Sequence, residues 1–282
     1  YPSVTIVGEL ANRRVSRNKW VYFDLKDEYG ILKFFGTVFA LPGPLEDGMQ
    51  LAVRGRPHIH ELYGFSVQVI HIQPVGEGTI KKAATLLAAK LESEGLFDLE
   101  RKRPLPFPPR TIGLITSMQS AAYADFSKVT AARYGGLEID AYDAQVQGEQ
   151  AVVDILAGLK HFNEEGRAPD VIVITRGGGS AEDLAVFSNE QVVRAVAASR
   201  VPTLVAIGHE VDLSLAELAA DARASTPSNA AELLVPDRKE LLAQLEDKKL
   251  WLRQGLRGQI EAMQSRLDSR EEHLHRRIEA TM

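Results

Sequence analysis

Short apolar runs alternate with longer helical stretches from residue 111 onward, and this alternation constrains the fold more than any other feature of the sequence. The apolar runs cover residues 112–115, 137–141, 171–174 and 204–207, and the helical stretches lie near 121–134, 149–165 and 182–199. Strands that alternate with helices are typical of βαβ crossovers, in which helices cover both faces of a parallel sheet. The sequence therefore predicts an α/β domain over residues 111–235.

The segment before this domain has a different pattern. Runs at residues 4–10, 20–26, 31–39, 51–58 and 65–72 carry alternating, β-branched or aromatic residues, and turn residues separate them. Five strands in about 75 residues are typical of a small Greek-key barrel such as the OB-fold. We therefore expect an all-β OB-fold domain over residues 1–78, followed by a helix and a proline-rich connector over residues 79–110.

Basic residues crowd into one short segment of the predicted barrel, between its first two strands. The cluster consists of Arg13, Arg14, Arg17 and Lys19, and Trp20 follows it directly. Such barrels use interstrand loops to bind oligonucleotides, and aromatic side chains stack on bases. We interpret these five residues as DNA-binding, although a solvated loop is the alternative for any isolated run of charge.

Other aromatic residues of the barrel are further stacking candidates. Tyr22, Phe34 and Phe65 lie in or beside the predicted strands. Because side chains alternate across a strand, about half of the aromatic residues must point into the barrel. Each single aromatic residue is therefore a core residue more often than a stacking platform.

The C-terminal segment, residues 236–282, is charged and helical. Its apolar residues mostly alternate three- and four-residue steps, which is typical of a coiled-coil seam. A helix with one apolar stripe needs a partner, from another copy of the chain or from a returning helix. We therefore expect the start of a coiled-coil stem that is cut short at residue 282. The seam residues are Leu245, Leu252, Leu256, Ile260, Met263, Leu267, Leu274 and Ile278.

The composition narrows the class of protein. The chain has no cysteine, which excludes disulfides and thiolate metal sites and is typical of a reducing compartment. The sequence contains no run of 18 apolar residues and no signal-peptide pattern at its start, so we expect a cytoplasmic protein with no membrane span. The net charge of −5 does not by itself indicate a nucleic-acid-binding protein. The first residue is Tyr1 rather than methionine, from which we expect that a preceding segment is missing.

A glycine-rich run follows the third predicted strand of the α/β domain. Arg176 precedes Gly177, Gly178 and Gly179, and Ser180 is a candidate N-cap of the next helix. Glycines let the backbone approach a ligand closely, and a helix N-terminus offers free N–H groups to an anion. The arginine adds a cation suited to phosphate. The run predicts a phosphate site, and the alternative is a tight turn with a surface arginine.

Polar residues also follow the fourth and first predicted strands. In parallel sheets, ligands bind beyond the carboxyl ends of the strands. His209 lies at such an end, and its imidazole suits proton transfer near neutral pH. Asp212 could orient that imidazole or hold a divalent ion. Ser117 follows the first strand, and Asp125 lies further along, in the helical stretch that comes next. The common HExxH, Walker A and GxGxxG motifs are absent from the sequence.

Motifs spread over nearly the whole chain resemble, in order and spacing, those of the large subunit of exodeoxyribonuclease VII. They are Val7-Gly8-Glu9-Leu10, the run from Trp20 to Asp27, Val53-Arg54-Gly55-Arg56, Glu94-Gly95-Leu96-Phe97, Pro104-Leu105-Pro106-Phe107, Arg176-Gly177-Gly178-Gly179-Ser180 with Glu182-Asp183-Leu184, Gly208-His209-Glu210 with Asp212, and Thr226-Pro227-Ser228 with Ala230-Ala231-Glu232.

The resemblance implies an enzyme that degrades single-stranded DNA from either end into oligonucleotides. It implies an OB-fold domain, a catalytic α/β domain and a coiled-coil stem on which small subunits dock. The residues considered catalytic in that family correspond to Asp125, Arg176, His209 and Asp212. Metal use varies across the family, so the resemblance leaves a need for Mg²⁺ open, with Asp212 or Asp125 as the candidate ligands.

The chain departs from the family pattern at three places. Met118, Gln119 and Ser120 replace a usual Pro-Thr-Gly, Ala124 replaces an arginine, and Ala185 with Val186 stands where a tryptophan-type residue is usual. These departures motivate an alternative hypothesis, a catalytically weakened scaffold that binds single-stranded DNA. A small-molecule phosphate enzyme fused to an OB-fold domain is a third hypothesis.

Overall fold

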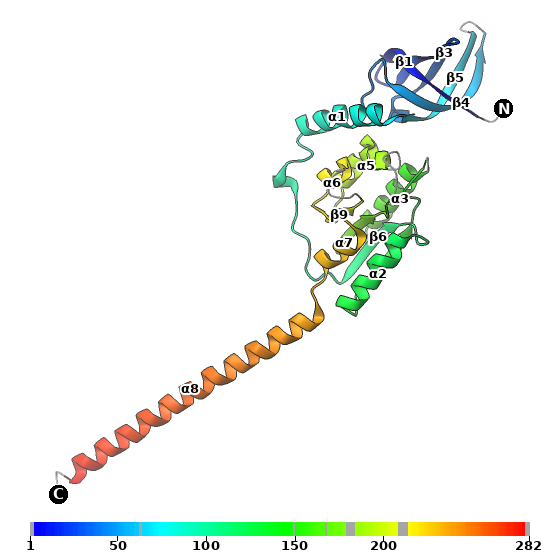
Figure 1. The fold of residues 1–282 in the computed structure, drawn as a ribbon. Helices are drawn as coiled ribbons and strands as arrows, with labels where there is room; N and C mark the ends of the chain where they lie inside the picture. Colours follow the sequence, from blue (N-terminus) through cyan, green and yellow to red (C-terminus); the bar gives the residue numbers. More distant parts are fainter. Residues whose placement is uncertain are drawn as a thin grey trace. The chain divides into compact units, whose positions relative to one another are not determined.

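The computed structural model describes residues 3–61, 64–148, 150–166, 168–178, 184–207 and 214–279. It contains a closed five-stranded barrel, a five-stranded sheet with flanking helices, and a long C-terminal helix (Figure 1). The chain forms two compact units, Tyr1–Val235 and Pro236–Met282. The barrel and the sheet belong to the first unit, and the long helix belongs to the second.

The barrel closes because its first strand pairs with both the second and the fourth. The strand order is β1-β2-β3-β5-β4, which confirms the predicted five-stranded barrel. Inward-pointing residues alternate with outward-pointing ones, so that Phe23 and Phe34 stack inside at 5.2 Å between ring centroids. The strands are β1 (Val4–Ser16), β2 (Trp20–Lys26), β3 (Ile31–Thr37), β4 (Gln50–His60) and β5 (Gly64–Pro74).

The first strand is longer than predicted, so part of the basic cluster lies in the strand rather than in a loop. A register shift between Ala11 and Arg14 interrupts the pairing of β1 with β2, after which pairing resumes to Ser16. Asn12 has a left-handed φ of 55°, and its side chain donates to Asp24. A bulge of this kind breaks the alternation on which a strand prediction rests, and the prediction therefore ended the strand too early.

The second sheet is parallel, as predicted. Its strand order is β10-β9-β8-β6-β7, and every neighbouring pair runs parallel. The central strand β8 is buried along its whole length, which explains its unbroken apolar run. The two-residue strand β10 was not predicted. The strands are β6 (Thr111–Thr116), β7 (Glu138–Asp143), β8 (Val171–Thr175), β9 (Thr203–Ala206) and β10 (Ala222–Arg223).

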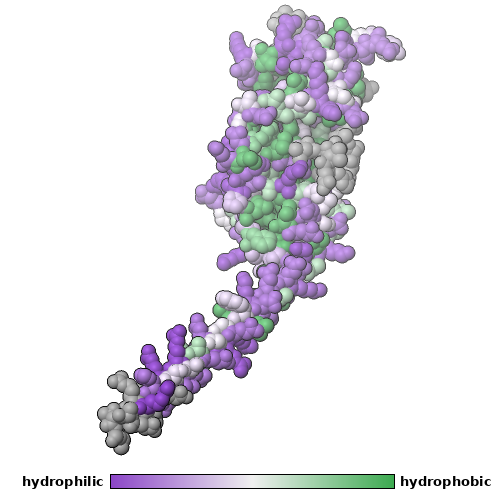
Figure 2. Space-filling model, turned by 60° about the vertical axis from the view of Figure 1, so that its left-hand side comes forward, coloured by the Kyte–Doolittle hydropathy of each residue, from purple (hydrophilic) through white to green (hydrophobic). Residues whose placement is uncertain are grey.

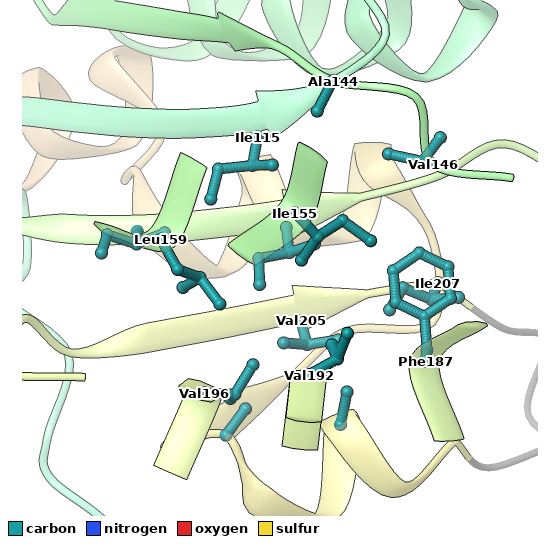
Figure 3. Close-up of a cluster of buried hydrophobic side chains, with 14 of the residues drawn as sticks. Ile115, Ala144, Val146, Ile155, Leu159, Phe187, Val192, Val196, Val205 and Ile207 are labelled. Atoms are coloured by element: carbon teal, nitrogen blue, oxygen red, sulfur yellow. The ribbon is translucent and has the colours of Figure 1, made fainter. Parts of the chain in front are cut away.

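Helices cover both faces of this sheet. On one face, Ile172 and Ile174 pack with residues of α3 (Ala151–Asn163), α5 (Glu190–Ala197) and α6 (Leu215–Ala219), and Figure 3 shows many of these side chains. On the other face, Val171 and Val173 pack with residues of α2 (Ala121–Arg133) and α7 (Pro227–Leu234). Successive side chains of β8 therefore pack into two hydrophobic cores, one on each face of the sheet.

The helical stretch predicted over residues 182–199 is divided in the structure. A 3-10 helix, η3 (Ala185–Ser188), precedes α5. The Asn189 side chain accepts a hydrogen bond from the Gln191 N–H and caps α5. An asparagine side chain that bonds the backbone in this way starts a new helix and does not continue the previous one.

Helix α1 (Glu77–Ser93) joins the barrel to the sheet domain within the first unit. Its Ala83 and Leu86 pack against the barrel core. Its Leu87 and Leu91 pack with Val193 of α5 and Leu215 of α6. The helix ends at Ser93, close to the predicted Gly95, whose φ of 74° only glycine adopts without strain.

The proline-rich connector is fixed to the sheet domain by its basic residues. The Arg103 guanidinium donates to both carboxylate oxygens of Asp221, at 2.9 and 2.7 Å. Burial alone would raise the pKa of Asp221, but the hydrogen bonds and charge of Arg103 and the Thr203 N–H lower it overall. Lys102 donates to the carbonyls of Leu218 and Ala220. These contacts hold the connector against the sheet domain.

The second unit consists of one helix, α8 (Arg238–Glu279), of 42 residues. Its described side chains are exposed, and on the face seen in Figure 2 its surface is mostly hydrophilic with smaller apolar areas along its length. The seam residues Leu245 to Leu267 belong to these exposed side chains, whereas the side chains of Leu274 and Ile278 lie outside the described part. The structure confirms the long helix, and the coiled coil stays a prediction. Among the described residues, no helix has the length and apolarity that a membrane crossing requires.

Candidate functional site

The carboxyl ends of the parallel strands bring several polar segments to one edge of the sheet. Thr116 at the end of β6 pairs with Asp143 at the end of β7, and Thr175 at the end of β8 pairs with Ala206 at the end of β9. The Arg176 N–H donates to the Ala206 carbonyl at 3.2 Å. The segment that follows β8 therefore starts directly beside the segment that follows β9.

Arg176 is buried, with 3% of its surface exposed. The alternative interpretation of this residue as a surface arginine is therefore wrong. A guanidinium is retained in a protein interior when a specific charge or hydrogen-bonding role holds it there. Its position after β8 places that positive charge at the edge where ligands bind in parallel sheets.

Gly177 and Gly178 follow Arg176, and their surroundings are open. A Cβ atom added at either position would meet no other atom within 4 Å, and neither residue has a left-handed φ. Within the described part of the chain, neither packing nor backbone strain therefore requires glycine here. A ligand that approaches the backbone closely would require it.

Four of the predicted site residues lie outside the described residues. Gly179 and Ser180 fall in the range 179–183, and His209 and Asp212 fall in the range 208–213. The residues that flank the second range are well packed. Ile207 and Phe187 belong to one buried cluster (Figure 3). Ser214 caps α6 through a reciprocal capping box with Glu217.

The segment after β6 is held by its own hydrogen bonds despite its unusual sequence. The Ser117 carbonyl accepts from the Ser120 N–H at 3.0 Å and from the Ser120 hydroxyl at 2.6 Å. The Met118 N–H donates to Asp143 at 2.9 Å. Ser120 also caps α2 by accepting from the Tyr123 N–H. The departures from the family pattern therefore leave this loop with a fixed backbone beside the sheet edge.

Asp125 lies on α2, on the solvent side of a helix whose Phe126 is fully buried. Within the described part of the chain, its carboxylate makes no ion pair or hydrogen bond. Clusters of three or more histidine or acidic residues that could hold a metal ion are absent from the described residues.

Thr116, at the end of β6, is a buried residue of this edge. Its side chain is fully buried, and in the described structure its hydroxyl oxygen makes no hydrogen bond. A buried hydroxyl without a partner is uncommon and calls for an explanation.

The outer face of the barrel carries a row of side chains that we name the belt. It consists of five directly paired residues on neighbouring strands: Arg14, Tyr22, Phe35, Gln68 and Arg56. All five point outward, and Tyr22 is 47% exposed. The belt therefore has an arginine at each end, with two aromatic residues and one amide side chain between them. The arginines suit phosphates of a nucleic-acid backbone, and the aromatic rings suit stacked bases.

The remaining predicted DNA-binding residues surround one end of the belt. Arg13 is exposed on β1, Arg17 and Lys19 are exposed in the turn to β2, and Trp20 is half-buried at the start of β2. Phe34 points into the core with 2% exposure, whereas Phe65 is exposed. The prediction that the aromatic residues divide between core and surface is confirmed.

Comparisons with known proteins find matches for the N-terminal barrel and for the region from residue 96 onward. A family model described as exonuclease VII, large subunit, matches residues 96–282, and a model of an OB-fold nucleic acid binding domain matches residues 1–73. The exodeoxyribonuclease 7 large subunit of Rhodopirellula baltica is 38% identical over 95% of this chain and 62% of its own length.

Two further relatives carry the same name. The protein of Moorella thermoacetica is 41% identical over 94% of this chain and 67% of its own length. The protein of Chlorobaculum tepidum is 41% identical over 95% of this chain and 69% of its own length. The chain therefore spans about two thirds of the length of the curated relatives that it matches.

Proposed function

Because the chain belongs to the exonuclease VII large-subunit family, we propose that it hydrolyses phosphodiester bonds of single-stranded DNA. The strand is degraded from both ends into oligonucleotides. The observation that carries this proposal is the buried Arg176 at the carboxyl edge of β8, hydrogen-bonded through its N–H to the last residue of β9. That contact joins the start of the segment that carries Arg176 to the end of β9, the strand after which His209 follows in the sequence.

The residues of this edge divide the chemistry between them. Arg176 and the N–H groups from Gly177 to Ser180 hold the scissile phosphate and stabilise the negative charge that grows on it, as preorganised donors do in other phosphoryl-transfer sites. Ser117 contributes a further hydroxyl from the neighbouring segment. Stabilisation of this kind depends on donors that are already in place, which the packing of β6, β8 and β9 supports.

His209 transfers the proton of the attacking water or of the leaving oxygen, and Asp212 orients its imidazole. Asp125 is a second carboxylate for orientation. If Mg²⁺ takes part, Asp212 and Asp125 are the ligands that we propose, and no step above requires it. The barrel supplies the strand through the belt and the basic residues Arg13, Arg17 and Lys19.

The assembly of the protein is part of the same proposal. We infer that residues 1–78, 79–110, 111–235 and 236–282 act as strand-binding domain, connector, catalytic domain and stem. The exposed seam of α8 is the surface on which the small subunit, or another copy of the chain, docks. The name "large subunit" of the relatives supports a two-subunit enzyme, and we propose that it acts in the cytoplasm.

The second candidate function is a strand-binding scaffold with weakened catalysis. The observation that favours it is the replacement of the usual loop sequence by Met118, Gln119 and Ser120. The scaffold predicts salt-sensitive strand binding without any product. A small-molecule phosphate enzyme has less support, because the belt offers a surface for a strand and not for a single small ligand.

The deciding experiment is a gel of end-labelled single-stranded DNA incubated with the full-length protein and its small subunit, with EDTA or with Mg²⁺. We expect oligonucleotide products from either labelled end. His209→Ala is expected to lower the rate by about 10²- to 10⁴-fold, the usual effect of a general acid or base, while strand affinity stays the same. Absence of product under both conditions supports the scaffold, and wild-type cleavage by the variant refutes the role of His209.

A further inference from the structure

A hollow of about 400 Å³ lies where the barrel, α1 and the sheet domain meet. We name it the junction hollow. Its walls are the loop after β3, the first three turns of α1, and residues that follow β8 and β9. The lining residues are Pro42, Gly43, Pro44, Leu45, Pro74, Glu77, Ile80, Lys81, Ala83, Ala84, Leu87, Leu184, Ala185, Ser188 and Ser214.

The walls of the junction hollow suit a flat, mostly apolar group. They are formed mainly by proline, leucine, isoleucine and alanine side chains. Among the described residues of its lining, Lys81 and Glu77 carry charge, and their charges are opposite. The described walls therefore suit a neutral group of moderate size better than a phosphate. Its volume is at the lower end of pockets that hold one small molecule, roughly 300–1,000 Å³.

Two residues of the lining directly follow, in the sequence, segments that carry proposed active-site residues. Leu184 directly follows the range 179–183, and Ser214 directly follows the range 208–213. The barrel wall is held against α5 by two hydrogen bonds. The Glu190 N–H donates to the Pro42 carbonyl at 2.9 Å, and the Gln191 amide donates to the Phe39 carbonyl at 2.7 Å.

Two segments of the chain run from the belt to the walls of the hollow, one along β3 and one along β5. On β3, the outward residue after Phe35 is Thr37, and the chain then passes through Phe39, which is 75% exposed, to Pro42 in the hollow wall. On β5, which pairs with β3, the chain runs from Gln68 to Pro74, another wall residue. A DNA strand that is bound on the belt and continues along β3 or β5 therefore reaches the hollow.

We propose that the junction hollow is a nucleobase subsite, which holds the base of a nucleotide next to the scissile phosphate. This inference rests on the function proposed above. A base can enter the hollow only when it is unpaired and unstacked from its neighbours, so the subsite selects single strands. Phe39 stacks on a base between the belt and the hollow, because any base offers a π-face to an exposed aromatic ring.

The test compares two alanines of α1. Ala84 lines the hollow, whereas Ala89 is exposed and does not line it. Ala84→Phe fills part of the hollow, and Ala89→Phe adds the same ring to solvent on the same helix. Both variants are prepared as full-length protein with the small subunit, and their melting temperatures are compared with that of the wild type before use.

The substrates are single strands that carry one abasic nucleotide at successive positions from the end. For the wild type, we expect one position at which the missing base slows cleavage about tenfold, the order of loss for one bound base. Ala84→Phe is expected to slow cleavage of the intact strand by a similar factor and to erase the position dependence. Ala89→Phe is expected to behave as the wild type, and Phe39→Ala to weaken strand binding about tenfold.

The two proposals fail in different ways. If the wild type neither binds nor cleaves single strands, the proposed function is wrong. If the wild type cleaves while Ala84→Phe matches Ala89→Phe on every abasic substrate, the subsite is wrong and the function stands. An Ala84→Phe variant that changes subunit association but not strand cleavage shows that protein covers the hollow, which also overturns the subsite. Should Ala84→Phe melt early, Ala185→Phe at another lining position provides the second variant, with the same loss of position dependence expected.

Discussion

The belt makes a quantitative prediction about strand binding, because it combines charge and stacking on the outer surface of the barrel. Arg14→Ala with Arg56→Ala removes the two cations at its ends. Each phosphate contact on a single strand contributes a slope of about −0.7 to the dependence of log affinity on log salt. The double variant is therefore expected to be less steep by about 1.4. Between 50 and 200 mM salt, the wild type should lose about sevenfold more affinity than the variant.

Tyr22→Ala is expected to act differently, because Tyr22 contributes a ring and not a charge. Loss of one stacked base costs about 1–3 kcal/mol, which corresponds to an affinity about 5- to 150-fold lower with the salt slope unchanged. Two residues of the barrel provide matched controls. Lys26 forms an ion pair with Glu9 at 2.7 Å, and Tyr29 is an exposed tyrosine in the turn after β2. Lys26→Ala and Tyr29→Ala should leave both the affinity and the slope close to wild type.

Fluorescence anisotropy with a labelled single strand measures both quantities, in EDTA and in a His209→Ala background that prevents cleavage. The arginine double variant should change the salt slope of the affinity, whereas Tyr22→Ala should change the affinity alone. Equal slopes for the wild type and the arginine double variant would show that the strand does not contact the ends of the belt. Equal effects of Tyr22→Ala and Tyr29→Ala would show that stacking on this face is not specific.

Three further predictions concern stability and the sheet edge. Asp221→Asn should destabilise the protein by about 2 kcal/mol at pH 7, because it breaks the charge pair with the partly exposed Arg103. The folded-state pKa of Asp221 is lowered, so the stability difference between wild type and variant should shrink as the pH falls from about 5 through that pKa. Urea titrations at several pH values measure this difference. Thr116→Val should leave stability unchanged or raise it by about 1 kcal/mol, since its buried hydroxyl lacks a partner in the described structure; a marked loss would mean that the hydroxyl is bonded in solution. Gly113→Ala should cost about 1–3 kcal/mol in thermal unfolding, because its Cβ would lie 3.0 Å from the Phe162 ring, and a wild-type melting temperature would contradict this packing.

The sequence predicted those parts of the fold that depend on local patterns. Apolar runs such as Val171–Thr175 are unbroken because the strand is buried on both faces, and this property is visible without any partner strand. The ends of these runs also indicated which edge of the sheet carries the polar segments. Arg176 and the start of the segment that contains His209 were therefore predicted to lie at the same edge.

The parts that the sequence did not predict depend on pairing between distant segments. The belt requires the register of five strands, and a shift of one residue in β3 or β5 would turn Phe35 or Gln68 inward. The extension of β1 depends on the left-handed Asn12, which residue identity alone does not fix. The burial of Arg176 depends on the elements packed around it. The junction hollow forms only when the barrel, α1 and the sheet domain are packed together.

The most direct test of the central claim is a double-mutant cycle in single-turnover cleavage of a labelled single strand. The full-length protein with its small subunit is compared with Arg176→Lys, His209→Ala and the double variant. If both side chains act on one phosphate, the double variant should lose little more rate than the more damaged single variant, because residues that act as a unit are not additive. Losses that multiply, with every variant folded and bound to the strand, would show that the two residues act independently and would contradict a shared site.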